Sequence, residues 1–555
     1  MTIKDRYNYW CRCVDKSDLA QLQSMNELER NQAFDGDIQF GTAGLRGIMG
    51  LGSNRINVYT IRQVTQAVAN YLLDKYPNQQ LQVVVSYDNR HNSRLFADTT
   101  AGVLSNNNIK CMVFDIPTST PILAYATRHF GCTIGIMITA SHNSSVYSGY
   151  KIFDNHGVQL IDTTKISQLV QAIEIFDVPT ISSQSHNNTT YIGQSIVDSY
   201  LDTLATHIDR SVFVDNHIDK NKFSMVYTPL NGTGCNIMPR MLTQYYNCTP
   251  YIVPEQNYCD GDFATCPQPN PEYIQSFELA IEVAKSTNAD IILATDPDAD
   301  RVGAMALHNG EYRHINGNEM GILLAEYLLS SNYAKSLNPH GHFGKALVDP
   351  IIIRTVVTTN LVDKIAKQYN AKVLTTLTGF KYIGNIARQL SSSSLVLGFE
   401  ESMGYLSGNH IGDKDAYIAT ALIVQLASLC KSRNITLIDQ LYNIFERYGH
   451  FSSSTQLVKF ESTYKIEEFM SNLRLNHHAC FGEYTVQQVC DYVAHEDDLM
   501  RSNMIVYQLD NDVELIFRPS GTEPLLKVYI LSCISPQCNN TVIDNLTQII
   551  VDMTK

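Results

Sequence analysis

Thr139-Ala140-Ser141-His142-Asn143 directly follows the apolar run Cys132–Ile138, and that run predicts a fully buried strand. The junction therefore places small polar groups at the carboxyl end of a strand, where open α/β sheets bind their ligands. Ser141 in such a loop can attack a substrate or carry a phosphoryl group, and His142 beside it can transfer a proton. A capped strand end without catalytic function is the alternative that these five residues leave open.

The residues after this loop predict a hairpin. Ser148-Gly149 is a turn signal, and Tyr150–Phe153 then predicts a returning strand. Such a hairpin would bring the ammonium group of Lys151 over Ser141. An exposed lysine with no role in a site is the alternative.

The composition is that of a globular protein with several domains. The chain has 555 residues, 44% of them hydrophobic and 17% charged, so we expect three or four domains that each bury a core. The net charge of −14 argues against a general nucleic-acid-binding protein, because a phosphate backbone requires a basic surface. The apolar run Ala416–Cys430 predicts a buried helix, since 15 residues that include Thr420 and Gln425 are too few and too polar for a membrane span.

The N-terminal residues and the cysteines indicate the cellular compartment. Met1–Trp10 is polar and mixed in charge, which does not fit a signal peptide. The thirteen cysteines show no paired framework. We therefore expect a protein of the reducing cytoplasm with no nucleic-acid or membrane partner.

Strands and helices alternate along most of the chain. Predicted strands at 81–85, 111–114 and 132–138 are separated by predicted helices. The alternation recurs from residue 223 and from residue 316, with later strands at 345–348, 372–376 and 395–397. It predicts three related α/β domains with mixed, mostly parallel sheets, whereas the last hundred residues predict a smaller, largely antiparallel α+β domain. We place the domains at residues 1–205, 206–315, 316–445 and 446–555.

A glycine-rich stretch, Phe40–Gly50, contains one arginine, Arg46. Glycine at positions 41, 44, 47 and 50 disfavours a helix or a central strand. We therefore expect a loop whose backbone approaches an anion closely, with the guanidinium group of Arg46 above it. A flexible surface loop is the alternative.

Asp296, Asp298 and Asp300 occupy alternate positions after a predicted strand at 290–294. In an extended loop this spacing would aim three carboxylates in one direction. Carboxylates so close repel one another unless a cation neutralises them, and hard oxygen ligands suit Mg²⁺. The spacing therefore predicts a magnesium site, with a solvated acidic turn as the alternative. Arg301 could hold a phosphate that bridges to the ion.

Further loops at predicted strand ends carry groups that suit a phosphorylated sugar. Glu400–Ser402 offers acceptors for sugar hydroxyls, and Thr378-Gly379 adds a hydroxyl and a backbone amide. Arg518–Pro524 combines a guanidinium group, two hydroxyls and a glycine amide, which together make a phosphate cradle. For Glu400–Ser402 the alternative is a helix N-cap, and for Arg518–Pro524 it is a Pro-Gly turn. Together the loops predict a site for a small phosphorylated polyol, one end of which faces Ser141.

These motifs, in this order, resemble the α-D-phosphohexomutase superfamily of phosphoglucomutases and phosphomannomutases. Thr139–Asn143 resembles its phosphoserine loop, Asp296–Arg301 its metal loop, Gly398–Ser402 its sugar loop and Arg518–Thr522 its phosphate loop. The forms of Phe40–Gly47 and of the sugar loop are more similar to the branch with phosphoglucomutase-2 and phosphopentomutase. The resemblance implies four domains arranged around a central cleft.

The resemblance also implies a mechanism. Ser141 would pass a phosphoryl group to the free hydroxyl of the sugar phosphate and regain one from the bisphosphorylated intermediate, so that glucose 1-phosphate and glucose 6-phosphate interconvert. One Mg²⁺ per active site and glucose 1,6-bisphosphate, as activator or intermediate, are the implied cofactors. The implied catalytic residues are Ser141, His142, Arg46 and Lys151, and the implied metal ligands are Ser141, Asp296, Asp298 and Asp300. The implied substrate-binding residues are Thr42, Arg301, Thr378, Gly379, Glu400, Ser402, Lys414, Arg518, Ser520, Gly521 and Thr522.

The chain departs from the family pattern at three positions. Ser144, Ser148 and Ala416 stand where the family usually has Pro, Asn and Gly, and the first two alter the serine loop without removing a chemical group. Mannose phosphates are candidates for additional substrates. The alternative enzyme is a phosphopentomutase acting on ribose or deoxyribose phosphates, or a sugar-bisphosphate synthase. An inactive sugar-phosphate-binding protein is the alternative from another class. The presence of Ser141, the three aspartates and Arg518 together argues against it.

Overall fold

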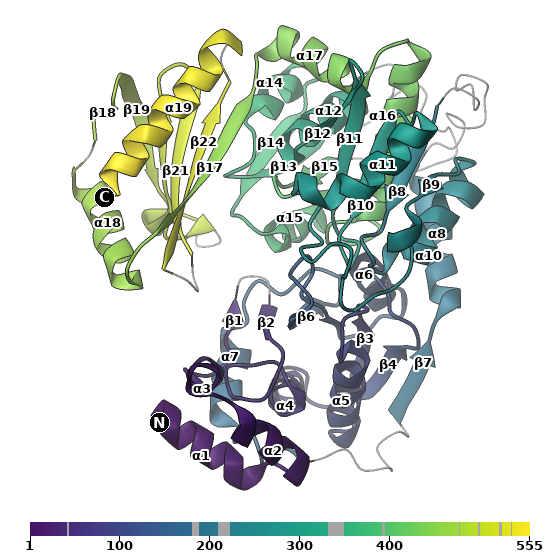
Figure 1. Ribbon diagram of the computed structural model, residues 1–555, viewed down its shortest axis with the longest axis vertical. Helices are drawn as coiled ribbons and strands as arrows, with labels where there is room; N and C mark the ends of the chain where they lie inside the picture. The colour runs from purple at the N-terminus through teal and green to yellow at the C-terminus, as the bar shows by residue number, and fades with distance from the viewer. Residues whose placement is uncertain are drawn as a thin grey trace.

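The computed structural model describes residues 1–41, 44–179, 188–208, 223–330, 349–390, 394–476, 478–497, 500–520, 524–533 and 536–554, and all structural statements below concern these residues. They form four β-sheets that are joined and covered by helices (Figure 1). Within this part of the chain, no helix combines the length and the apolar character that crossing a membrane would require.

The first sheet has seven strands in the order β1-β2-β6-β5-β3-β4-β7. Its strands are β1 (Phe40–Gly41), β2 (Gly44–Ile48), β3 (Gln82–Tyr87), β4 (Lys110–Phe114), β5 (Ile134–Ile138), β6 (Tyr147–Asp154) and β7 (Thr189–Ile192). The strands β3, β4, β5 and β7 run parallel, and β6 returns antiparallel to β5, which confirms the predicted hairpin. All of β5 is buried because α5 (Ser93–Asn106) and α6 (Thr120–His129) both pack against it.

Six further helices belong to this N-terminal region. They are α1 (Ile3–Cys13), α2 (Lys16–Ser24), α3 (Glu27–Phe34), α4 (Val58–Lys75), α7 (Thr164–Ala172) and α8 (Gln194–His207). The first three pack around Trp10 and Phe34, whose ring centroids lie 5.7 Å apart. The predicted helical lead-in therefore has a small core of its own beside the first sheet.

The second sheet is mixed, with the order β12-β11-β10-β8-β9. Its elements are β8 (Met225–Thr228), α10 (Gly234–Arg240), β9 (Tyr251–Ile252), α11 (Glu278–Thr287), β10 (Ile291–Thr295), β11 (Val302–His308) and β12 (Glu311–Ile315). The strands β8, β9 and β10 run parallel, whereas β11 turns back antiparallel to β10. The turn between β10 and β11 therefore lies at the carboxyl end of a buried strand.

The third sheet has the order β14-β13-β15-β16. Its elements are α12 (Gly317–Leu329), β13 (Ile351–Thr355), α14 (Leu361–Gln368), β14 (Lys372–Thr376), α15 (Phe380–Ala387), β15 (Leu395–Phe399), β16 (Tyr405–Leu406), α16 (Ala416–Ser432) and α17 (Leu437–Tyr448). The strands β13, β14 and β15 are parallel.

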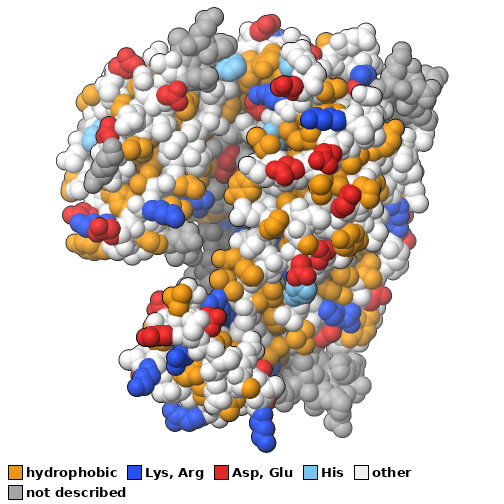
Figure 2. Space-filling model, viewed as in Figure 1, with side chains coloured by type: hydrophobic (Ala, Val, Ile, Leu, Met, Phe, Trp, Pro, Cys, Tyr) orange, Lys and Arg blue, Asp and Glu red, His pale blue; other side chains and the backbone are white. Residues whose placement is uncertain are grey.

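The fourth sheet is antiparallel throughout, with the order β17-β22-β21-β20-β19-β18. Its elements are β17 (Ser452–Lys459), α18 (Thr463–Asn476), β18 (Cys480–Phe481), β19 (Tyr484–Asp491), β20 (Ile505–Leu509), β21 (Val513–Pro519), β22 (Leu525–Ser532) and α19 (Pro536–Met553). Figure 2 shows that the surface is hollowed between this C-terminal part and the N-terminal sheet. Three α/β domains with mixed, mostly parallel sheets, followed by a C-terminal antiparallel sheet with two helices, confirm the predicted fold class.

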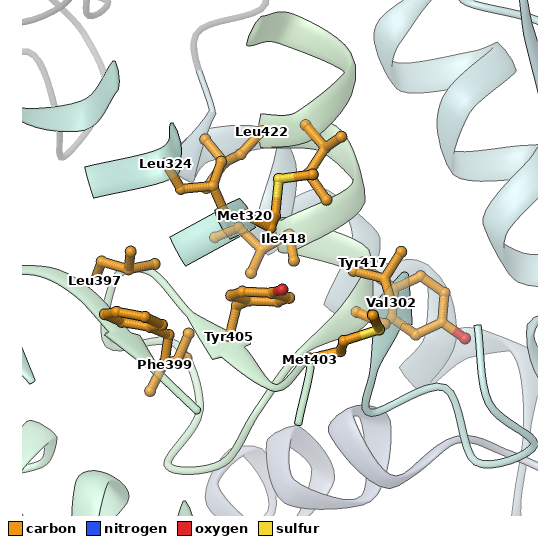
Figure 3. Close-up of a cluster of buried hydrophobic side chains, with 14 of the residues drawn as sticks. Val302, Met320, Leu324, Leu397, Phe399, Met403, Tyr405, Tyr417, Ile418 and Leu422 are labelled. Atoms are coloured by element: carbon orange, nitrogen blue, oxygen red, sulfur yellow. The ribbon is translucent and has the colours of Figure 1, made fainter. Parts of the chain in front are cut away.

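One hydrophobic core connects the second and third sheets to the helices of the first. The helix α16 is buried along almost its whole length, which confirms the buried helix predicted at 416–430. Figure 3 shows Met403 and Tyr405, from the β15–β16 hairpin, in this core with Val302 of β11. Because Val302 N also donates to Met403 O at 3.2 Å, the loop before β11 and the loop between β15 and β16 are held side by side.

The glycine-rich stretch is a correction. We expected a loop over Phe40–Gly50, but Gly44–Ile48 forms β2, an interior strand of the sheet. The glycines allow close approach of two backbones: a Cβ on Gly44 would lie 2.6 Å from Tyr150 O, and one on Gly149 would lie 2.5 Å from Thr139 O. Glycine here serves strand packing, which a composition argument alone does not reveal.

Two other expectations change. Ser148-Gly149 is not the turn of the hairpin but part of β6, and the chain turns before it, where Tyr147 N donates to Ser144 O at 3.1 Å. The strand expected at 345–348 lies outside the described residues, and β13 at Ile351–Thr355 was not predicted.

The close packing of β2 against β6 gives a stability prediction. We expect Gly149→Ala to lower the free energy of unfolding by about 3 kcal/mol, because the added methyl group meets only backbone atoms that cannot move aside. Gly47→Ala is the matched control, since its methyl group meets the flexible end of Ile38 and we expect a loss below about 1 kcal/mol. Urea unfolding midpoints measure both changes, and equal midpoints for the two variants would contradict this packing.

Candidate active site

The loop Asp296–Asp300 is a tight turn and not the extended segment that the alternating spacing suggested. Ala299 has φ 48°, and Asp296 Oδ1 accepts hydrogen bonds from the backbone N–H groups of Asp300 (3.1 Å) and Arg301 (3.0 Å). The carboxylates converge because these two hydrogen bonds to the Asp296 side chain bend the backbone of the loop into a turn. Their predicted convergence is therefore found, for a different physical reason.

The three carboxylates form a compact buried cluster. Asp296, Asp298 and Asp300 are fully buried, and each offers an oxygen within 4.8 Å of the others. Asp298 Oδ1 and Asp300 Oδ1 have no hydrogen-bond partner among the described residues. Buried carboxylate oxygens without donors are costly. Hard oxygen donors in this arrangement fit Mg²⁺, so the residues present are suited to hold the predicted ion.

Ser141 lies directly against this cluster. Its Oγ donates to Asp296 Oδ2 at 2.9 Å, although the two residues are 155 positions apart in the sequence. Ser141 has φ 54°, and its backbone N–H donates to Thr139 Oγ1 at 2.9 Å. Thr139 in turn donates to the buried Asp88 at 2.6 Å. The serine is thus held in a left-handed conformation by a chain of buried hydrogen bonds.

Arg90 is a residue of this site that our sequence analysis missed. Its Nη2 donates to Ser141 O (2.6 Å) and Asn143 O (2.5 Å), and its Nη1 donates to Ser144 O (2.6 Å) and Tyr147 O (3.1 Å). A single buried guanidinium group therefore binds four carbonyls of the serine loop and of the turn that follows it. Because the contact to residue 144 is made to a carbonyl, the serine that replaces the usual proline does not remove it.

Arg90 could have been predicted from the same signal as Ser141, which is a polar segment at the end of a buried apolar strand. Asp88 and Arg90 directly follow the buried strand β3, just as the serine loop follows β5. Thr120 was also missed: its Oγ1 donates to Asp298 Oδ2 at 2.7 Å. Thr120 begins α6 and carries no motif, so nothing in the sequence pointed to it.

Two lysines from distant parts of the chain, one in β6 and one in the segment before α16, compensate the carboxylate charge. Lys151 Nζ lies 2.9 Å from Asp298 Oδ2 and 3.4 Å from Asp300 Oδ2, and Lys414 Nζ lies 2.8 Å from Asp300 Oδ2. Burial acts to raise the pKa values of Asp298 and Asp300, but these ammonium groups outweigh burial, so both pKa values lie below their ordinary value. The pKa of Asp296 is raised by burial and by the two neighbouring carboxylates.

His142 and Arg46 lie beside the serine. His142 Nδ1 is 3.3 Å from Ser141 Oγ, and burial, followed by the charges of Arg301 and Arg46, holds the pKa of His142 well below its ordinary value. The imidazole is therefore neutral at neutral pH. Arg46 Nη1 donates to Asn143 Oδ1 at 2.7 Å, and burial lowers the pKa of Arg46 only to about 10, so it stays charged.

The hairpin that carries the sugar loop meets the metal loop through the paired backbones of Arg301 and Gly404. Glu400 Oε1 accepts a hydrogen bond from Gly379 N at 2.9 Å. Burial, followed by the charge of Glu401, raises the pKa of Glu400 to about 7. Arg301 Nη1 pairs with Glu272 Oε1 at 2.6 Å, whereas Arg301 Nε is buried with no hydrogen-bond partner among the described residues.

The remaining predicted site residues fall into three groups. Thr378 Oγ1, after β14, is buried with no hydrogen-bond partner among the described residues, and Ser402, between β15 and β16, is half-buried. Arg518, at the end of β21, lies close enough to Glu401 for its charge to oppose the burial that raises the pKa of Glu401. The fourth sheet thus brings Arg518 to the sugar loop. Thr42, Gly521 and Thr522 lie outside the described residues.

Comparisons with known proteins agree with this architecture. Models of the phosphoglucomutase/phosphomannomutase family match the chain over residues 37–175 (alpha/beta/alpha domain I), 198–309 (domain II) and 316–448 (domain III). The chain is 33% identical over 542 residues to the phosphoglucomutase of Staphylococcus aureus strain MRSA252, with 92% of each chain covered.

Two solved structures share the fold. One is a phosphoglucomutase/phosphomannomutase family protein from Burkholderia thailandensis, with TM-score 0.69, 17% identity, and 93% of this chain and 97% of that chain covered. The other is pp63/parafusin, a phosphoglucomutase from Paramecium, with TM-score 0.68, 18% identity, and 94% and 95% covered. At these identities the similarity extends to the fold alone.

The unpartnered carboxylate oxygens give a prediction about divalent cations. We expect saturating Mg²⁺ to raise the melting temperature, because a ligand at about 100 times its Kd stabilises the folded state by about 2.7 kcal/mol. Asp298→Asn should abolish this increase, since it replaces a ligand oxygen at the centre of the cluster. Glu311→Gln, which alters an exposed carboxylate at the start of β12, is the control and should keep it. Thermal unfolding with Mg²⁺ and with EDTA measures the effect, and an equal Mg²⁺ response in Asp298→Asn would move the cation elsewhere.

Proposed function

The chain belongs to the phosphoglucomutase/phosphomannomutase family, and on that premise we propose that it is a phosphoglucomutase, which interconverts glucose 1-phosphate and glucose 6-phosphate. The observation that carries the proposal is the hydrogen bond of 2.9 Å from Ser141 Oγ to Asp296 Oδ2. It joins a hydroxyl that can carry a phosphoryl group to a set of carboxylates that can hold a divalent cation. Phosphoryl transfer needs little more than this pairing and a positioned acceptor.

In this proposal Ser141 is the phosphoryl carrier. Asp296, Asp298, Asp300 and an oxygen of the phosphorylated serine would hold Mg²⁺, which when bound offsets negative charge on the transferring group. Arg90 keeps the serine loop in one geometry by binding its carbonyls, and so it is a positioning residue. Neutral His142, 3.3 Å from Ser141 Oγ, can exchange a proton with the hydroxyl.

Lys151 and Lys414 would supply positive charge where the phosphoryl group moves. Both ammonium groups already lie in the cluster, and both come from elements other than the aspartate turn. A charge that is fixed before the reaction costs no reorganisation during it. We assign them the stabilisation of the transferring group, together with Arg46.

The sugar would be held from the third and fourth sheets. Glu400 and Ser402 accept and donate hydrogen bonds to hydroxyls, and Arg518 with Ser520 binds the phosphate that is not being transferred. Glucose 1,6-bisphosphate, the proposed intermediate, has a phosphate at each end. Whichever phosphate lies away from Ser141 therefore needs the same cradle, which explains why one site can serve both O1 and O6.

A substrate panel tests the function. We expect glucose 1-phosphate to be converted with Mg²⁺ and a trace of glucose 1,6-bisphosphate, and conversion to stop with EDTA. Mannose 1-phosphate and ribose 1-phosphate, measured in parallel, report the preference for ring size and for the configuration at C2. A faster reaction with ribose 1-phosphate would replace the proposal by a phosphopentomutase, and no turnover of any of the three would favour a binding protein.

The phosphoryl carrier is tested separately. We expect Ser141→Ala to lose turnover entirely and to take up no phosphate from glucose 1,6-bisphosphate, because no hydroxyl remains next to the carboxylates. Ser145→Ala, in the same loop, is the matched control and should keep both. Intact-mass measurement after incubation detects the phosphate, and a phosphorylated Ser141→Ala protein would refute the assignment. Circular dichroism checks that both variants fold.

The pKa of Glu400 gives a pH prediction. A carboxylate is the better acceptor of sugar hydroxyls, and with a pKa of about 7 this group becomes protonated as the pH falls through neutrality. We therefore expect KM for glucose 1-phosphate to rise about tenfold from pH 8 to pH 6. Glu400→Gln should have a raised KM that varies less with pH. The substrate phosphate titrates equally with both proteins, so a pH-independent ratio of their KM values would contradict this role.

A further inference from the structure

Two cysteines outside the active site lie in contact. Cys235 Sγ of α10 is 3.6 Å from Cys259 Sγ, in the segment that follows β9. Cys235 is buried, whereas Cys259 is exposed to solvent. A disulfide requires a sulfur–sulfur distance of about 2.05 Å, so the two atoms need to approach by only about 1.5 Å to bond.

We propose that Cys235 and Cys259 form a reversible disulfide when a peroxide reaches the pair. One sulfur attacks a peroxide oxygen, the O–O bond breaks, and water leaves after proton transfer, which gives a sulfenic acid. The second sulfur then attacks the first, the S–O bond breaks, and a second water leaves. The two thiols lose two electrons and hydrogen peroxide gains them, so the reaction balances as two thiols and one peroxide to one disulfide and two waters.

The local electrostatics favour the first step. The hydrogen bond from Cys259 is the main cause that lowers the pKa of Cys235, and the same contact with burial raises the pKa of Cys259. Cys235 therefore forms a thiolate more readily than an ordinary buried cysteine and is the sulfur that attacks the peroxide, whereas Cys259 closes the disulfide.

The pair lies behind the aspartate turn. Cys259 Sγ contacts Gly232 O at 3.9 Å, and a Cβ on Gly232 would lie only 2.4 Å from the backbone of Pro297. The next residue, Thr233, donates to Pro297 O from both its N–H (2.8 Å) and its Oγ1 (2.9 Å). Pro297 stands between Asp296 and Asp298, so movement at Gly232 is passed directly to two of the three carboxylates.

The same segment also supports the serine loop. Phe263 lies under Arg90, with the guanidinium carbon 5.0 Å from the ring centroid. Asp262 Oδ1 is 2.7 Å from His91 Nε2, and a Cβ on Gly261 would lie 3.0 Å from both Asn89 O and His91 N. The segment 259–263 therefore joins the aspartate turn to the residue that holds Ser141.

These contacts predict the consequence of the bond. Closing the sulfur–sulfur distance would shift the backbone around Gly232. This backbone is packed so closely against Pro297 that the shift would also displace Pro297. We expect the disulfide to weaken divalent-cation binding about tenfold, the usual size of a disturbance behind metal ligands. A loss of turnover should accompany it. That second effect rests on the proposed function, whereas the disulfide and the cation affinity do not.

The linkage is tested on the full-length protein. We would treat it with hydrogen peroxide, block the remaining thiols with N-ethylmaleimide, digest with trypsin and search for the linked peptides by mass spectrometry. Because the tryptic peptide with Cys259 also contains Cys248 and Cys266, fragment ions and the variants Cys259→Ser and Cys248→Ser assign the partner. We expect the linkage in wild type and in Cys248→Ser and not in Cys259→Ser. Absence of the 235–259 linkage in wild type would overturn the proposal.

The consequence is tested with Mn²⁺ as the probe. Titration calorimetry on the oxidised wild type should give an affinity about tenfold lower than on the reduced protein, restored by dithiothreitol. Cys259→Ser should be unaffected by peroxide. An unchanged Mn²⁺ affinity in a protein shown to be linked would overturn the proposed coupling. If the reduced protein turns over no sugar phosphate while the linkage and the affinity change are both found, the proposed function fails and this inference stands.

Discussion

Three buried carboxylates on one turn are the constraint on which the rest of the site depends. Asp296, Asp298 and Asp300 have essentially no exposed surface, and uncompensated charges of this kind are not stable in a protein interior. The compensation comes from outside the turn: Lys151 from the first sheet and Lys414 from the segment after β16. Ser141 adds a hydroxyl donor. The need to neutralise one turn therefore fixes the relative positions of three sheets.

This constraint also accounts for the dense hydrogen bonding around the serine loop. A hydroxyl placed beside a carboxylate cluster must approach from one direction, and Ser141 does so in a left-handed conformation. Such a backbone persists only where its surroundings hold it. Arg90 supplies this support through the loop carbonyls, and Asp88 balances the charge of Arg90 at 3.0 Å. The Ser141 hydroxyl and the carboxylate cluster are thus positioned by two buried charge networks that meet at Ser141.

The fold class and the chemical motifs could be predicted from the sequence because they depend on local patterns. Apolar runs that end in polar loops located β5, β10 and β15 and the residues that follow them. The strands β17 and β19 were missed because they carry Ser, Thr and Gln and are buried on alternate positions at most. β13 was missed because Arg354 interrupts its apolar run, and only the structure shows that Arg354 is paired with Asp363. The role of Gly44 in β2 could not be predicted locally, because it allows the backbone of β6, far along the chain, to approach closely.

What the sequence could not provide is the set of contacts between distant segments. Thr120 has no motif, yet it donates to Asp298 across 178 positions. The aspartate spacing predicts an extended loop. In the structure the carboxylates converge instead because Asp296 accepts hydrogen bonds from two backbone N–H groups of its own turn. Charge balance is a property of the assembled cluster and not of any one motif. Two solved structures keep this fold at only 17–18% identity to this chain. This is expected, because many different sequences can form the scaffold that brings a few polar side chains together.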